Sequence, residues 1–166
     1  YMTLETEKII YNLNTNIGVY PSKGTIINNS KSIYSLRGEY HANTYNFIFT
    51  DSVKIIDKEY QIFTDNMIYN SKSETSFFFG PSVIVSEENK IFCENGWYNT
   101  NTLKSKFFNN AHIQSDSQIL KGDSIFYDQN KQYGKALQNV HLIDSVNNIE
   151  IFADEAELFK SEDYLI

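Results

Sequence analysis

Apolar positions recur along this chain at a fixed interval that five tyrosines make visible. Tyr11, Tyr40, Tyr69, Tyr98 and Tyr127 follow one another at 29 residues, since 40−11, 69−40, 98−69 and 127−98 each give 29. The fifteenth residue after each tyrosine is a branched aliphatic: Ile26, Ile55, Ile84, Ile113 and Leu142. Another aliphatic precedes the tyrosine by seven residues: Leu4, Ile33, Ile62 and Ile91. A fixed period of this size is typical of repeat architectures, in which each unit buries its apolar face on its neighbours.

Each repeat is expected to contain two strands. The first runs from seven residues before the tyrosine to one residue after it, at residues 4–12, 33–41, 62–70, 91–99 and 120–128. The second carries its apolar residues nine, thirteen and fifteen positions after the tyrosine, and odd offsets share one face of a strand. Polar turns separate these runs every 10 to 15 residues, which favours an antiparallel meander.

Both kinds of strand are predicted to bend near the middle. An acid stands four residues before most of the tyrosines, at Glu7, Asp65, Glu94 and Asp123, with Leu36 as the exception. Pro21, Gly80 and Pro81 fall ten to twelve residues after a tyrosine, where a bulge or corner is expected. Bent antiparallel strands stack into two facing sheets with a common interior.

We therefore expect an all-β fold, a repeat-built antiparallel slab of two facing bent sheets, in a single domain over residues 1–166. Residues 153–160 have a composition that favours helix. The phase of the repeat predicts a strand there, because Ile-Phe-Ala-Asp at 151–154 repeats Ile-Phe-Cys-Glu at 91–94 with two extra residues in the preceding turn.

Charge and cysteine content exclude several classes of partner. The chain has 14 basic and 21 acidic residues, and no basic run long enough to follow a phosphate backbone, so nucleic acid is not expected. Cys93 is the only cysteine, which rules out an internal disulfide and a thiolate metal cage. No apolar run reaches the length of a membrane-spanning helix. The chain enters the repeat by Leu4 without a leader pattern, and we expect that an export signal was removed.

No residue has the context of a catalytic or metal-binding group. His112 and His141 occupy equivalent sites one repeat apart, about 10 Å from each other across two strand spacings, too far to share one zinc ion. We expect both to face solvent. The periodic acids, which continue at Asp154, fit bends better than a catalytic pair, and Ser52 and Ser124 lack a nucleophile elbow. Cys93 occupies a small-residue position and is expected to be buried. Neither an enzymatic activity nor a cofactor is expected.

Three stretches resemble the organic-solvent-tolerance (OstA, LptA-like) family. They are Leu-Lys-Gly-Asp-Ser-Ile-Phe-Tyr-Asp at 120–128, the run from Gly134 to Asp144, and Ile-Phe-Ala-Asp-Glu-Ala at 151–156. The Asn-Val element of the family pattern is explicit at 139–140 and weaker at 110–111 and 52–53. This family includes the periplasmic bridge protein of lipopolysaccharide transport and the N-terminal domain of its outer-membrane partner.

The resemblance implies a twisted, partly open β-jellyroll, or β-taco, whose apolar interior holds the acyl chains of lipid A in the periplasm. It also implies end strands that join head to tail with other transport-bridge domains or with further copies of the chain. Unpaired sheet edges do associate with other chains unless they are blocked, and a contact between two different edges can propagate.

The interior positions with this pattern form the proposed lipid-binding lining: Phe49, Ile55, Phe78, Ile84, Phe107, Ile113, Val140 and Leu142. Two other classes of function stay open. One is a structural or adhesion module whose apolar ladders close into a dry core, which periodicity does not distinguish from a core that admits lipid. The other is a carbohydrate-active repeat enzyme, which needs clustered, non-periodic carboxylates.

Overall fold

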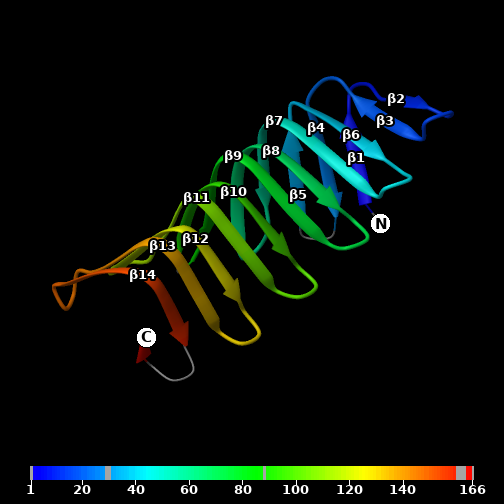
Figure 1. The fold of residues 1–166 in the computed structure, drawn as a ribbon. Coiled ribbons are helices and arrows are strands. Elements are labelled where there is room, and N and C mark those ends of the chain that lie inside the picture. The colour runs from blue at the N-terminus through cyan, green and yellow to red at the C-terminus, as the bar shows by residue number, and fades with distance from the viewer. Residues whose placement is uncertain (1, 29–30, 88, 160–163, 166) are drawn as a thin grey trace.

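The computed structural model describes residues 2–28, 31–87, 89–159 and 164–165. Within these ranges the chain contains no helix, and its strands form one antiparallel sheet of 15 strands (Figure 1). No helix in the described part is therefore long and apolar enough to cross a membrane. The prediction of an all-β fold is confirmed.

Short strands build the N-terminal end of the sheet and long strands build the rest. The short strands are β1 (Met2–Thr6), β2 (Ile10–Asn12), β3 (Ile17–Tyr20), β4 (Gly24–Asn28), β5 (Lys31–Ser35) and β6 (Arg37–His41). The long strands are β7 (Asn46–Ile56), β8 (Tyr60–Asn70), β9 (Thr75–Ser86), β10 (Lys90–Asn99), β11 (Lys104–Gln114), β12 (Gln118–Asp128), β13 (Tyr133–Asp144) and β14 (Ile149–Phe159). A final short strand, β15 (Tyr164–Leu165), pairs with the end of β14. The strand predicted over 153–160 is confirmed up to residue 159, and Lys160 lies outside the described residues.

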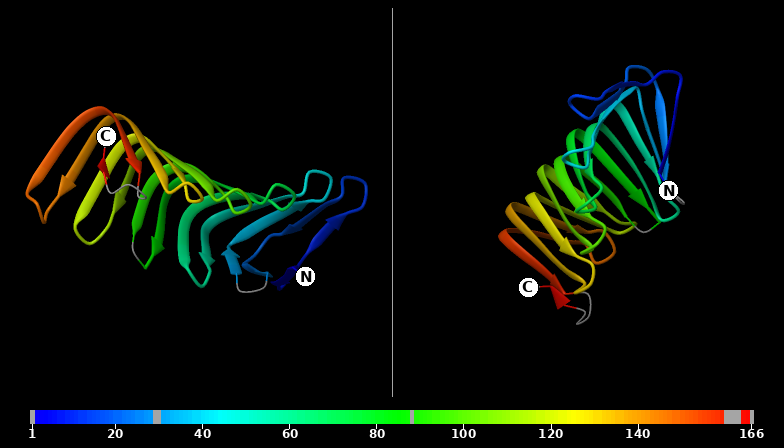
Figure 2. Two further views of the ribbon diagram at one scale, coloured as in Figure 1. Left: turned by 90° about the horizontal axis from the view of Figure 1, so that it is seen from below. Right: turned by 90° about the vertical axis from the view of Figure 1, so that its right-hand side faces the viewer.

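Every long strand bends near its middle, so the sheet folds over on itself into two facing arms, seen as a row of arches in Figure 2. We call the arm that carries the repeat tyrosines the tyrosine arm, for example residues 46–50 and 66–70, and the other arm the isoleucine arm, for example residues 53–56 and 61–64. The pairing register shifts between the two arms at each pair of neighbouring long strands. The two facing layers that the sequence predicts are thus the arms of one continuous sheet.

Left-handed backbone residues make the bend at the predicted place. They lie eleven and twelve positions after the repeat tyrosine, at Asp51, Ser52, Gly80, Asn109, Asn110, Gln138 and Asn139. Asparagine and glycine tolerate this conformation better than other residues do. Acids on the neighbouring strand meet the bend, since Asn110 Nδ2 donates to Glu94 Oε1 at 2.5 Å and Asn139 Nδ2 donates to Asp123 Oδ2 at 3.0 Å.

The prediction of single long strands over residues 4–12 and 33–41 is wrong. The structure divides the first into β1 and β2 and the second into β5 and β6, with a break at Leu36. On the N-terminal side of β7 the two arms therefore separate, because β5 pairs with one half of β7 and β6 with the other. Leu36 stands where other repeats place an acid, and its backbone N–H donates to the carbonyl of Asp51 at 3.1 Å.

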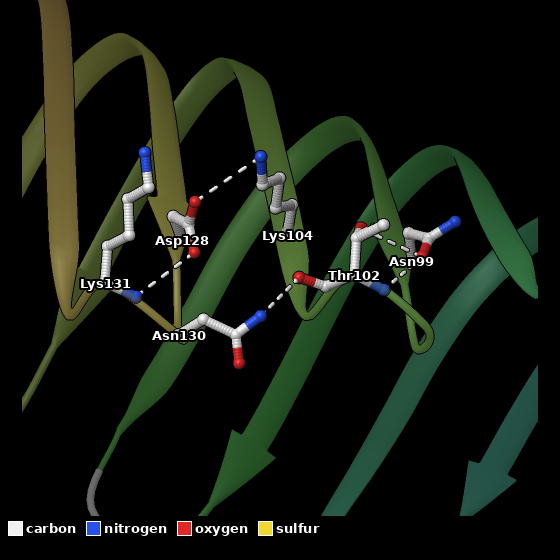
Figure 3. Close-up of polar contacts among 6 residues, drawn as sticks. All are labelled: Asn99, Thr102, Lys104, Asp128, Asn130 and Lys131. Carbon is white, nitrogen blue, oxygen red and sulfur yellow. Dashed lines mark hydrogen bonds and ion pairs between the residues drawn. The ribbon is translucent and has the colours of Figure 1, made fainter.

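The turns of the tyrosine arm stack on one another at the repeat interval. In each turn the fifth residue after the tyrosine is left-handed, and in four of the turns its carbonyl accepts a hydrogen bond from the next turn. The donor and acceptor residues are Ala42 and Asn16, Ser71 and Tyr45, Thr100 and Glu74, and Gln129 and Leu103, at 2.9 to 3.0 Å. Side chains reinforce this column, as Figure 3 shows for Asn130, whose Nδ2 donates to the carbonyl of Thr102 at 3.1 Å. The column fixes the spacing of the repeats along the tyrosine arm.

Two of the predicted turns of the isoleucine arm fall partly outside the described residues. The turn at 28–30 includes Asn29 and Ser30, and the turn at 87–89 includes Glu88. Backbone bonds close two further turns of this arm, from the Asp57 N–H to the carbonyl of Tyr60 and from the Ser115 N–H to the carbonyl of Gln118, each at 2.9 Å.

Candidate functional site

An unbroken ladder of aliphatic side chains crosses the inner face of the isoleucine arm. Each member is the direct cross-strand neighbour of the next, because the 29-residue repeat keeps the register constant from strand to strand. The ladder comprises Leu4, Ile26, Ile33, Ile55, Ile62, Ile84, Ile91, Ile113, Leu120, Leu142 and Ile151. We call this row the aliphatic ladder.

A second inner row faces it from the tyrosine arm, and the row ends in small side chains at its C-terminal end. From β3 to β14 the row runs Tyr20, Gly38, Phe49, Met67, Phe78, Gly96, Phe107, Ile125, Ala136 and Ala156. The middle of the row carries large side chains, whereas its last two members are alanines. The interior therefore loses filling volume along the stack of strands.

Apart from Leu4 on the edge strand β1, which is partly buried, the exposure of the aliphatic ladder rises between β8 and β9. Ile26, Ile33, Ile55 and Ile62 are only 2 to 4% exposed. From Ile84 onward every member is only partly buried, and Ile151 is 42% exposed. The buried residues accordingly divide into two clusters, one around Phe49, Met67 and Phe78, and one around Phe107, Ile125 and Val140. The N-terminal half of the interior is a packed core, and the C-terminal half has a smaller buried cluster beside a ladder that is only partly buried.

Aromatic side chains close the N-terminal half across the gap between the arms. Tyr60, at the tip of the isoleucine arm, meets Tyr98 of the tyrosine arm edge to face, with ring centroids 6.3 Å apart. Burial raises the pKa of Tyr60 to about 12, helped by the nearby carboxylates of Asp57 and Glu59. Burial likewise raises the pKa of Tyr98. Both phenols therefore stay neutral at physiological pH.

A small cavity and an open recess share Tyr60 in their walls. The cavity, about 20 Å³, is lined by ladder residues such as Ile55 and Ile62 and by Tyr98, and it has room for about one water molecule. The recess, about 670 Å³, is lined mainly by polar residues of the turn tips and includes Gln129 of the opposite arm. Tyr60 thus stands between the packed core and open solvent.

The predicted lining residues all face the interior, but they do not share one environment. Phe49, Ile55 and Phe78 belong to the packed N-terminal cluster and are at most 3% exposed. Phe107 and Val140 are buried in the C-terminal cluster. Ile84, Ile113 and Leu142 are partly exposed members of the aliphatic ladder. The structure therefore brings together as open apolar surface only the last three of the eight.

His112 and His141 lie on the outer face of the isoleucine arm, opposite the aliphatic ladder. Lys121 separates them in the cross-strand register, so they are two strands apart as the repeat predicts. Each ring stacks on a phenylalanine, His112 on Phe92 at 4.4 Å and His141 on Phe152 at 4.3 Å between centroids. They lie on the solvent-facing side of the sheet, as predicted, and the stacking leaves them half-buried.

No metal-binding cluster of three or more His, Cys, Asp or Glu side chains occurs among the described residues. Two of the periodic acids, Glu94 and Asp123, lie at the bends and accept hydrogen bonds from separate partners, Asn110 and Asn139. Ser124 lies on the outer row of the tyrosine arm next to Leu137. Cys93 is buried at the bend, as predicted, and burial raises the pKa of its thiol to about 11.

Sequence reasoning identified Phe49, Phe78 and Phe107 of the second inner row, but missed the members of that row on the alternate strands and the Tyr60–Tyr98 contact. The signal for the row was present, because Met67, Gly96 and Ile125 each stand two residues before a repeat tyrosine, on the same face as the tyrosine itself. Tyr60 lies nine residues before Tyr69, outside the recurring pattern. A contact between two arms depends on how the bent sheet twists, and no local pattern reports that twist.

Comparison with known proteins agrees with the predicted resemblance. The family model described as OstA-like protein matches residues 1–65 and again residues 56–116. Comparison with curated proteins found no significant match. The fold is also similar to a solved structure, LptH from Pseudomonas aeruginosa, the LptA-homologous periplasmic component of the conserved lipopolysaccharide transport device, with 10% sequence identity, a TM-score of 0.37 and coverage of 82% of both chains. Since the family model covers well over half of the sequence, this chain belongs to the OstA-like family.

Proposed function

We propose that this protein is a non-enzymatic carrier that shields the acyl chains of lipopolysaccharide in its apolar interior during transport between the inner and outer membranes. The observation that carries the proposal is the partly exposed half of the aliphatic ladder, from Ile84 to Ile151, facing inward from one arm of the fold. Membership of the OstA-like family supports lipopolysaccharide as the lipid.

The mechanism is passive burial. Apolar surface that a folded chain leaves in contact with water inside a groove is stabilised when an apolar ligand covers it. Each methylene removed from water contributes about 0.8 kcal/mol, so a few acyl chains provide tight binding without any catalytic group. Passive burial has no direction of its own, and net movement of lipid has to be driven by an energised partner.

We further propose that the chain works as one domain in the periplasm and joins neighbouring bridge domains, or further copies of itself, through its edge strands. Within the described residues β1 pairs only with β4 and β2 only with β3. At the other end, β15 pairs with Leu158 and Phe159 of β14, while residues 149–157 of β14 have strand pairing on one side. Sheet edges of this kind recruit further strands.

Photo-crosslinking to purified lipopolysaccharide tests the proposed ligand. A benzophenone amino acid replaces Ile84, which faces the groove, and in a matched protein it replaces His112, on the outer face. We expect crosslinks at position 84 alone. Absence of crosslinks at both positions in folded protein would reject lipid carriage and favour the second candidate.

The second candidate is a structural or adhesion module with a closed core. The packed cluster around Phe49, Met67 and Phe78 favours it, because in that half the side chains of the two arms already fill the interior. Such a module self-associates without lipid. Native mass spectrometry of the purified protein separates the two candidates, since the carrier is expected to retain lipid and the module is not.

A further inference from the structure

We infer that the acyl-chain site occupies only the C-terminal half of the interior, from β9 to β14, and that Tyr60 and Tyr98 end it. This inference rests on the proposed function and assigns the two tyrosines as residues that limit how much of an acyl chain the protein accepts. The size of the inner side chains, the contacts between the arms and the charges beside them each limit the site to this half.

Comparison of equivalent positions in the five repeats shows where a large inner side chain is missing. The ninth residue after the tyrosine is aromatic in four repeats, at Tyr20, Phe49, Phe78 and Phe107, but in the fifth it is Ala136. Its cross-strand neighbour on β14 is Ala156, which is partly exposed. On β12 and β13, the ladder residues Leu120 and Leu142 stay partly exposed, whereas their counterparts in an earlier repeat, Ile33 and Ile55, are buried. The absent aromatic rings leave apolar surface for a ligand to cover.

The arm-to-arm contact also stops at a definite repeat. Tyr98 meets Tyr60, which stands 38 residues earlier in the sequence (98−60). One repeat earlier, the residue 38 positions before Tyr69 is Lys31 (69−31), and both residues line the small cavity. One repeat later, the residue 38 positions before Tyr127 is Asn89 (127−89). Asn89 has no aromatic ring to reach the opposite arm. Beyond Tyr60 and Tyr98 the gap between the arms loses its aromatic closure.

The shape of the open part suits an extended aliphatic chain. The partly exposed ladder crosses six strands, β9 to β14, and five strand spacings of roughly 4.8 Å give about 24 Å. At the closed end, Asp57, Glu59 and Glu87 line the recess beside Tyr60, with Lys58 as the one cation among its described lining residues. An anionic headgroup is repelled there. The methyl end of the acyl chain, and not its charged end, therefore lies against the two tyrosines.

Substitutions that restore the missing side chains test the site. Lauric acid, a 12-carbon probe, is titrated into the wild-type protein and into the variants Ala156→Phe and Asn89→Tyr. If each new ring displaces about two methylenes, binding weakens by about 15-fold, because one buried methylene is worth about a factor of four. Ser124→Phe is the matched control, since residue 124 lies on the outer row of the arm that carries Ala156, and the affinity of this variant for lauric acid is expected to stay within about twofold of wild type.

Removal of the Tyr60 ring gives a second test, in which the preferred length of the fatty acid is measured. Tyr60→Ala removes the ring that meets Tyr98, so the variant is expected to prefer palmitic acid, with 16 carbons, over lauric acid by more than the wild-type protein does. If Ala156→Phe and Asn89→Tyr bind lauric acid as tightly as Ser124→Phe does, the site lies elsewhere and the inference is wrong while lipid carriage stands. If the wild-type protein binds no lauric acid and gives no lipopolysaccharide crosslink at position 84, the proposed function itself fails.

Discussion

The hydroxyl groups of Tyr20 and Ser35 lie 2.6 Å apart inside the N-terminal end of the fold. Ser35 Oγ donates its own proton to the carbonyl of Arg37 at 2.8 Å, so the phenol of Tyr20 is the donor to Ser35. The bond holds the Tyr20 ring across β6, directly over Gly38. Three short strands, β3, β5 and β6, are thereby joined where the two arms separate.

Gly38→Ala is expected to destabilise the protein by about 1–3 kcal/mol, the usual cost of overpacking a well-filled core. A Cβ at position 38 overlaps the Tyr20 ring, and the ring is held by Ser35 and cannot move aside without breaking that bond. Urea unfolding measures the change in the free energy of unfolding. Gly134→Ala is the control, since its nearest neighbour is 3.7 Å away, and equal effects of the two substitutions would contradict the packing described here.

The period of the sequence predicted the strands, the bends and the inner face because each depends on local spacing. The left-handed residues at 51–52, 109–110 and 138–139 fall where the offset from the tyrosine places a corner. The break of the first strands was not predictable in this way. Leu36 is a single substitution for the acid that other repeats carry at this position. The arms separate here because the neighbouring chain is also divided, into β3 and β4.

The sequence predicted which side chains face the interior, but not which part of the interior a ligand reaches. Phe49 and Leu142 follow the same pattern, and only the packing of the opposite arm buries one and leaves the other partly exposed. That difference depends on side chains that are far apart in the sequence, such as Tyr60 and Tyr98. A periodic pattern reports which residues face inward, and the filling of the interior decides which of them a ligand reaches.

Asn99→Ala is expected to cost about 1–2 kcal/mol of stability through the column of turns. Asn99 Oδ1 accepts hydrogen bonds from the backbone N–H groups of Asn101 and Thr102 at 3.0 and 2.7 Å, and Nδ2 donates to the preceding turn at the carbonyl of Ser73 (Figure 3 shows the bond with Thr102). Thermal unfolding checks the loss. Asn101→Ala alters an exposed side chain of the same turn and is expected to unfold within about 0.5 kcal/mol of wild type; similar losses at both positions would disprove the role of Asn99.

Asp144 makes the stability of the turn at 144–147 depend on pH. Hydrogen bonds from the N–H groups of Asn147 and Val146 and from the Gln118 side chain lower the pKa of its carboxyl to about 2, from 3.8. A lowered pKa in the folded state stabilises the fold above pH 3.8, and this contribution is lost as the pH falls through about 2.

NMR titration of the Asp144 carboxyl is expected to show a midpoint near 2 in the folded protein. Asp144→Asn keeps a side-chain oxygen that accepts from the turn but does not titrate, so its stability is expected to vary less than that of wild type between pH 4 and 2. A carboxyl that titrates at its ordinary value would show that these hydrogen bonds do not persist in solution.

The Cys93 thiol is expected to react slowly in the folded protein. Burial raises its pKa to about 11 from 9.0, which lowers the thiolate fraction about 100-fold, and the side chain is only 4% exposed. Reaction with an aromatic disulfide reagent at pH 8 is therefore expected to be at least about 100-fold slower than in urea-unfolded protein. Comparable rates in the two states would mean that the bend around Cys93 opens frequently.

The two faces of the isoleucine arm provide the most direct test of the groove through neighbouring residues. Ile84 belongs to the partly exposed aliphatic ladder, and Val85 lies on the outer face beside Gln61 and Lys90. A charged side chain inside an apolar site loses hydration without gaining a partner. Ile84→Asp is therefore expected to weaken lipopolysaccharide binding by about tenfold or more, and Val85→Asp to change it by less than about twofold. Circular dichroism confirms that both variants fold, and Ile84→Asn provides an uncharged replacement if Ile84→Asp does not. Equal losses of affinity at positions 84 and 85 would show that lipid does not bind on the inner face.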